Sequence, residues 1–121
     1  MDEKLYRVLL KLLDQTVSGK IMWDDASRIS EGEKFRVSFG DAIVEIWDSD
    51  VSSYDDEYGE VSKRVLHAHV LNPMGLVVAQ QTFSTDLGVP YKTLEKLFLA
   101  ARSSARRSDA VLDNLLQKLG A

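Results

Sequence analysis

Two histidines are the residues whose type and spacing come closest to metal or acid–base chemistry. His67 and His69 lie two positions apart in a stretch of alternating apolar residues, and side chains two apart in a strand point to the same face. The pair is therefore a candidate set of ligands for a divalent metal ion. Because the sequence nominates no third ligand, we expect both rings on the solvent face of a strand, opposite Leu66, Ala68 and Val70.

An acidic segment with two tyrosines is the second candidate site. Residues 41–60 contain eight acidic residues and no Lys or Arg. Counted from Asp48, the segment lacks the Gly at position 6 and the Glu at position 12 that a calcium-binding loop requires. We interpret 48–60 as a solvated loop between strands. Tyr54 and Tyr58 are candidate partner-binding residues, because aromatic side chains are enriched in interface hot spots.

Arg102, Arg106 and Arg107 form the one compact basic cluster of the sequence. Guanidinium groups can contact phosphate, so a weak nucleic-acid surface is one hypothesis. The chain has a net charge of -4 and a pI near 5.1, which argues against it, since nucleic-acid affinity comes largely from phosphate neutralisation. We expect instead that the cluster interacts favourably with a helix C-terminus and pairs with acids elsewhere.

The inventory of residues excludes several kinds of chemistry. The sequence has no Cys, which rules out disulfides, thiolate metal sites and cysteine nucleophiles. It also lacks the nucleophile elbow, the phosphate-binding glycine loops and the H-E-x-x-H pair. With no basic and apolar leader at its start and no apolar run of about 20 residues, the chain is expected to be cytoplasmic.

Hydrophobic spacing then predicts the elements that position these residues. A chain of 121 residues is expected to form one domain, 1–121. Apolar residues at helical spacing predict a first helix, and a period of two predicts strands joined by tight turns at Gly40-Asp41 and Asn72-Pro73-Met74-Gly75. The expected elements are a helix over 2–18, a short edge strand over 20–23, and strands over 34–39, 42–47, 62–71 and 76–83.

The C-terminal third is expected to be helical. Pro90 suits the start of a helix with Leu94, Leu97 and Phe98 on one face. The polar run Arg102–Ser108 predicts a break or bend, with Ser108 as the N-cap of a last segment. Because the strands are consecutive and their connections short, we expect an α+β fold: an N-terminal helix, a four- or five-stranded antiparallel meander sheet, and a C-terminal helix or helix pair.

Two stretches resemble a group of small uncharacterised bacterial proteins. Residues 12–23 read LLDQTVSGKIMW, which is similar to an LLxxTxxGKxxW pattern in that group, and the segment 94–119 resembles its C-terminal helix. The resemblance implies a bacterial or phage source and a small stand-alone protein. It implies no activity, and no functional residue is carried over from it.

These observations favour a non-enzymatic protein-interaction or regulatory module. We expect a protein partner or self-association, for which the leucine-rich helix with Leu112, Leu115, Leu116 and Leu119 is suited. Two alternatives stay open: a metal- or small-ligand-binding protein or enzyme that uses His67 and His69, and a nucleic-acid binder that uses the arginine cluster. No cofactor and no membrane partner are expected.

Overall fold

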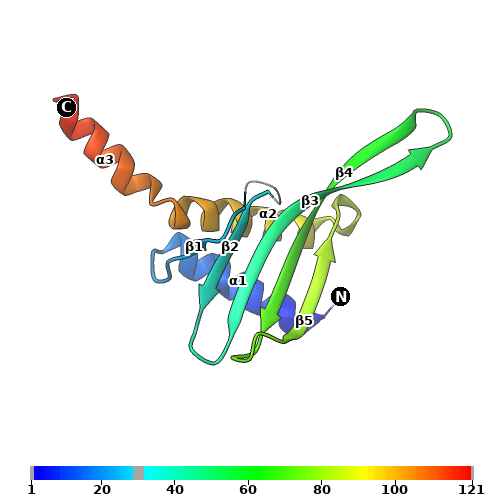
Figure 1. Ribbon diagram of the computed structural model, residues 1–121, viewed down its shortest axis with the longest axis horizontal. Helices are drawn as coiled ribbons and strands as arrows, with labels where there is room; N and C mark the ends of the chain where they lie inside the picture. The colour runs from blue at the N-terminus through cyan, green and yellow to red at the C-terminus, as the bar shows by residue number, and fades with distance from the viewer. Residues whose placement is uncertain (1, 29–31, 121) are drawn as a thin grey trace.

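The computed structural model describes residues 2–28 and 32–120, in an order of one helix, five strands and then helices (Figure 1). The predicted α+β class is confirmed. Residues 29–31, which lie between the strands expected over 20–23 and 34–39, are outside the described residues. The elements are α1 (Glu3–Val17), β1 (Asp24–Asp25), β2 (Lys34–Ser38), β3 (Ile43–Asp55), β4 (Gly59–Leu71), β5 (Val77–Phe83), the 3₁₀ turn η1 (Thr85–Leu87), α2 (Val89–Ala105) and α3 (Ser108–Lys118).

The five strands form one antiparallel sheet in the order β1-β2-β3-β4-β5, which confirms the predicted meander. Tight turns set the register. At the first, Phe39 N donates to the Ala42 carbonyl at 2.8 Å, and Gly40 supplies the positive φ of 81° that other residues adopt only with strain. At the turn after β4, the Asn72 side chain accepts from the backbone N–H of Met74 and Leu76.

Helices α1 and α2 lie side by side over one face of the sheet and leave the other face uncovered (Figure 1). Their apolar stripes pack on the inward residues of β2, β3 and β4, which alternate as the period of two requires. Within the described residues, no helix is both long and apolar enough to cross a membrane. The largest fully buried side chains are Trp23, Phe35, Phe83, Phe98, Leu9, Ile46, Leu66, Leu94 and Leu97.

Trp23 links both helices through a buried polar network. Its indole is 2% exposed and Nε1 donates to Thr16 Oγ1 at 2.9 Å. The Thr16 hydroxyl in turn donates to the Leu12 carbonyl at 2.6 Å, while Trp23 N donates to Ser104 Oγ at 2.9 Å. The segment after α1 is thereby fixed to α1 and α2 together.

The same contacts explain why the edge strand predicted over 20–23 is wrong. Lys20 N and Ile21 N donate back to the Gln15 carbonyl at the end of α1, and Trp23 N is bound by a side chain. With these donors engaged, the backbone cannot form a ladder there. The first strand is displaced to Asp24–Asp25, where it pairs with β2.

The loop predicted over 48–60 is also wrong. Strands β3 and β4 pair without interruption from Ile43↔Leu71 to Asp55↔Gly59. The Asp55 side chain accepts from the backbone N–H of Glu57 and Tyr58, and Gly59 has a φ of 77°, so the acidic residues close a hairpin. Residues 50–62 form a two-stranded projection that extends beyond the helices (Figure 1), and we call it the arm.

The break predicted between Arg102 and Ser108 is confirmed, but its cap is not. Helix α2 ends at Ala105 and α3 begins at Ser108 itself, with Arg107 as the cap residue. Arg107 has a φ of 50°, a left-handed conformation that redirects the chain. As a result α3 leaves the body at the end opposite the arm (Figure 1).

The Trp23 network predicts a clear stability effect. Thr16→Val keeps the side-chain shape and removes the acceptor of a buried indole N–H, so we expect a loss of about 1–3 kcal/mol. Urea unfolding followed by tryptophan fluorescence measures it. Thr85→Val, at an exposed position, is the matched control and should stay within about 0.5 kcal/mol of wild type. Equal urea midpoints for the two variants would show that the Thr16–Trp23 hydrogen bond does not stabilise the fold.

Candidate interaction surfaces

The uncovered face of the sheet carries a row of stacked side chains across four strands. Lys34, Trp47, His67 and Thr82 occupy successive cross-strand positions of β2, β3, β4 and β5. The Lys34 ammonium lies 4.8 Å from the Trp47 ring centre, and the His67 ring stacks on Trp47 at 4.9 Å and 17°. His69 meets the same indole edge-on at 4.5 Å. Both faces of Trp47 are therefore occupied within the chain.

His67 is held by a hydroxyl at each ring nitrogen. Nε2 lies 2.7 Å from Ser49 Oγ and Nδ1 lies 3.2 Å from Thr82 Oγ1. Burial lowers the pKa of His67, the charge of His69 lowers it further, and Asp48 opposes the shift. Burial likewise lowers the pKa of His69, against the raising effect of Glu45 and with a smaller lowering effect of Lys34. Both rings favour the neutral form.

The structure places the two histidines as the sequence predicts, on the face opposite Leu66, Ala68 and Val70. It does not assemble a metal centre around them. Among residues 2–28 and 32–120, no three His, Asp or Glu side chains form a group that could hold a metal ion. Because both nitrogens of His67 already have hydroxyl partners, a metal site with this pair would first have to break those contacts. The metal hypothesis stays a prediction without a third ligand.

Two arginines of the basic cluster are committed to acids within the chain. Arg102 forms a two-pronged pair with the Glu33 carboxylate at 2.7 and 2.9 Å. Arg106 contacts the same carboxylate at 2.7 Å and Asp25 at 3.3 Å. The hydrogen bonds of Asp25 with Ser27, together with Arg106, lower the pKa of that carboxyl.

These ion pairs give Arg102 and Arg106 a structural role. The Arg102 and Arg106 guanidiniums also lie over the Phe98 and Phe35 rings, so they close the core at the end of α2. Arg107 instead forms the left-handed link to α3. The cluster thus holds the 24–36 region against α2, and a nucleic-acid surface made of these residues stays a prediction.

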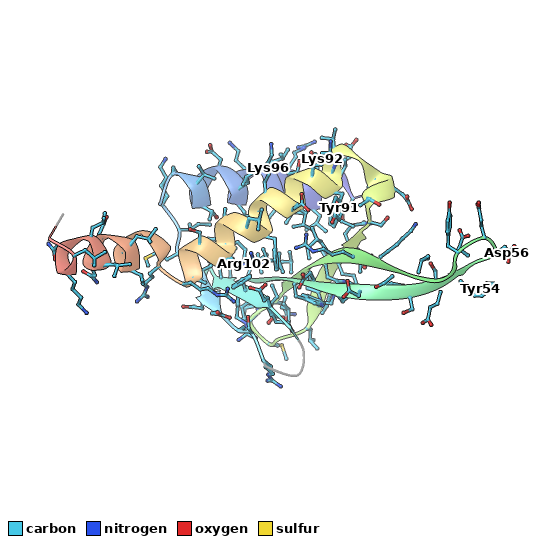
Figure 2. The ribbon with its side chains drawn as sticks, turned by 90° about the horizontal axis from the view of Figure 1, so that it is seen from above. Tyr54, Asp56, Tyr91, Lys92, Lys96 and Arg102 are labelled. Atoms are coloured by element: carbon cyan, nitrogen blue, oxygen red, sulfur yellow. The ribbon has the colours of Figure 1, made fainter. Side chains whose placement is uncertain are left out.

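The arm presents the two tyrosines that the sequence singles out. Tyr54 and Tyr58 are both 77% exposed, and Figure 2 shows Tyr54 and Asp56 at the far end of the projection. The arm carries five acids (Asp50, Asp55, Asp56, Glu57 and Glu60) and no Lys or Arg. It therefore offers aromatic surface surrounded by negative charge, with no part of the body covering it.

Helix α3 and its C-cap residue Leu119 present five large apolar side chains to solvent. All its side chains that the structure describes are exposed, and within the described chain its one substantial contact is with α2. The leucines of α3 are not buried against the sheet, because the turn at Arg107 directs α3 away from the sheet. The exposed fractions are 59% for Val111, 56% for Leu112, 49% for Leu115, 52% for Leu116 and 71% for Leu119.

Three structural features were not predicted from the sequence. The continuation of β3 and β4 was hidden because neither face of the arm is buried, so no alternation of apolar residues marks it. Glu33 and Asp25 gave no local signal, since their arginine partners are 69 and 81 residues away. For the stack on Trp47, the one signal in the sequence was the two-residue spacing of His67 and His69, which places both rings on one face of the strand.

No family model matches the chain, and no curated protein or solved structure is significantly similar to it. The resemblance in residues 12–23 and 94–119 consequently stays a prediction. The function has to be argued from the surfaces themselves.

The histidines predict a specific pH dependence of stability. Their pKa values in the folded protein lie below the ordinary 6.5, so the unfolded chain binds more protons as pH falls below that value. Stability is therefore fully present above pH 6.5 and declines as pH falls toward the lowered folded values. We expect the decline between about pH 7.5 and 5.5 to be smaller in the His67→Gln, His69→Gln double variant. Urea midpoints measured at both pH values test this, and parallel declines in the two proteins would contradict it.

Proposed function

We propose that the protein is a non-enzymatic protein-interaction module that assembles through α3, with a second copy of the chain as its partner. The observation that carries the proposal is the exposure of 49–71% of every large aliphatic side chain from Val111 to Leu119. Large apolar surface on a projecting element marks an interaction site, because exposing it to water costs free energy.

The helix also needs a partner for its own stability. Helix α3 has 11 residues, and an isolated helix of that length is marginal in water even with good helix formers. Beyond the Arg107 turn, Figure 1 shows α3 projecting away from α2 and the sheet. Packing of the leucine stripe against another helix would supply the missing stabilisation.

The stripe is complementary to itself. Its members occur at 111, 112, 115, 116 and 119, and the first four are symmetric about the midpoint between Asp113 and Asn114. An antiparallel pair about a two-fold axis at that midpoint sets Leu112 against Leu115 of the second copy and Val111 against Leu116 of the second copy. Such an arrangement is an isologous interface, the commonest kind in homodimers.

The available area fits a dimer. The five exposed side chains offer on the order of 500 Å² per copy, hence roughly the 1,000 Å² in total that a specific interface must reach. A groove of about 390 Å³, lined by Ala110 together with Val17, Ile21 and Met22, lies on the other side of α3, since Ala110 is about 170° around the helix from the centre of the stripe.

Disruption of the stripe should abolish self-association. We expect Leu112→Ser, Leu116→Ser to give a monomer at concentrations where wild type is a dimer, because two central apolar contacts per copy are lost. Sedimentation equilibrium measures the mass. Leu99→Ser, on α2 and 48% exposed, is the control and should leave the dimer intact. A wild-type monomer at on the order of 100 μM would refute the proposal, since a Kd above that concentration corresponds to less than about 5.5 kcal/mol of association free energy.

The absence of Cys allows the register to be tested directly. A tagged Leu112→Cys chain mixed with an untagged Leu115→Cys chain should give a disulfide between tagged and untagged chains on mild oxidation, because the antiparallel pair sets these positions face to face. A parallel pair would instead join equal positions, so tagged chains would link to tagged chains. Gel mobility of the oxidised mixture separates the two outcomes.

A further inference from the structure

We propose that the tip of the arm binds a groove on the outer side of α1 in a second copy of the chain. The contact is separate from the α3 pair and is carried by different residues. It joins the acidic, tyrosine-bearing end of one molecule to a basic, apolar-walled site on another.

The groove lies between α1 and the turn after β2. It measures about 380 Å³, and Leu12 forms its buried part while Val8 and Phe39 are 40% and 44% exposed. Aromatic and aliphatic walls of this kind accept an aromatic side chain from a partner. A tyrosine ring is of a size to fit there.

Three cations border the groove. Lys4, Arg7 and Lys11 are spaced three and four residues apart along α1 and all line it, so they share one side of the helix. Within the described residues, none of them forms an ion pair. Lys4 also lies in the first turn, where positive charge opposes the helix dipole. The positive charge of the groove is thus free to meet an anionic partner.

The arm has the matching chemistry. Tyr54 and Tyr58 project from it at 77% exposure, and its five acids are uncompensated by any Lys or Arg within residues 50–62. Opposite charge around an apolar contact gives an interface orientation and speeds encounter. The same chain therefore carries both halves of the contact.

The occupant of the groove must come from a second molecule. The groove wall Phe39 directly follows β2, whose last residue pairs with Ile43 at the start of β3. The arm tip follows Asp55 at the other end of the 13-residue strand β3, a distance of roughly 40 Å at about 3.3 Å per residue. Figure 1 shows the tip and the β2–β3 turn at opposite ends of the sheet. An arm cannot fold back to its own groove.

The contact is tested in the Leu112→Ser, Leu116→Ser chain, so that the result does not depend on the α3 pair. We expect residual self-association in sedimentation velocity at about 50 mM salt and its loss at about 500 mM, because exposed charge pairs are screened. Two charge reversals, Arg7→Glu, Lys11→Glu in the groove and Asp56→Lys, Glu57→Lys in the arm, should each weaken it at least about tenfold. Asp55 is left unchanged because it closes the turn.

The decisive comparison is the combined reversal. A chain with both sets of changes keeps Lys4 in the groove and Asp50, Asp55 and Glu60 in the arm, but two carboxylates now face two ammonium groups, so its association should recover at least about threefold over either single reversal. An equimolar mixture of the two singly reversed chains should also associate. Lys92→Glu, Lys96→Glu is the matched control: these α2 lysines (Figure 2) lie outside the groove residues, and the change in net charge is the same.

The Tyr54→Ala, Tyr58→Ala variant tests the apolar half of the contact. It should weaken association at low salt without altering net charge, because it removes the rings proposed to enter the groove. The proposal is overturned if the background chain is monomeric at low salt, if the α2 control weakens association as much as the groove reversal, or if the combined reversal is folded by circular dichroism and fails to recover.

Discussion

Arg64 lies at the edge of the hydrophobic core, and its position determines where the helix-covered part of the sheet stops and the arm begins. Its guanidinium binds Asp48 at 3.2 Å and Glu95 of α2 at 3.1 Å, and it lies over the Phe98 ring at 5.4 Å. On one side of Arg64 the sheet is covered by apolar helix surface. On the other side β3 and β4 continue with no helix above them, so polar and acidic residues are tolerated on both of their faces. The ion-paired arginine is thus the boundary between body and arm.

That boundary follows from a mismatch of lengths. A 17-residue helix such as α2 is about 25 Å long, whereas a 13-residue strand such as β3 is about 43 Å long. Helices of this length cannot cover the full length of β3 and β4, so one end of the two strands stays uncovered. The uncovered face of the sheet is stabilised differently, by cross-strand stacking of Lys34, Trp47 and His67 and by the Arg36–Glu45 pair, which make a helix above them unnecessary.

Elements whose apolar residues are buried in the core were predicted correctly from the sequence, whereas elements without a buried apolar face were not. The inward residues of β2 and α2, such as Phe35 and Leu97, lie as their periodicity indicates, and so do the turns at Gly40 and Asn72. The arm was misread because its pairing rests on backbone hydrogen bonds and a turn closed by Asp55, with no apolar alternation. The direction of α3 could not be predicted from the sequence. Helical spacing identifies the apolar face of a helix, but it does not show which surface packs against that face.

The candidate sites show the same contrast between local features, which were predicted, and long-range contacts, which were not. His67 and His69 share a face, as strand geometry demands, but the hydroxyls of Ser49 and Thr82 that bind His67 come from neighbouring strands whose register no local pattern specifies. Arg102 and Arg106 pair with acids as expected, whereas Arg107 forms no ion pair among the described residues, and the partner Glu33 was not identified from the sequence. Contacts between residues far apart in sequence depend on topology, so a single sequence can nominate one half of such a pair and rarely both.

The two proposed surfaces differ in physics and in position, and this has a consequence for assembly. The α3 stripe is apolar, so salt should leave its association unweakened, while the arm contact is ionic at its border and is screened by salt. Because α3 and the arm extend from opposite ends of the body (Figure 1), a two-fold α3 pair leaves both arms and both α1 grooves available. Dimers joined through α3 can then be linked by arm contacts into larger assemblies, whose size depends on ionic strength while the dimer itself does not.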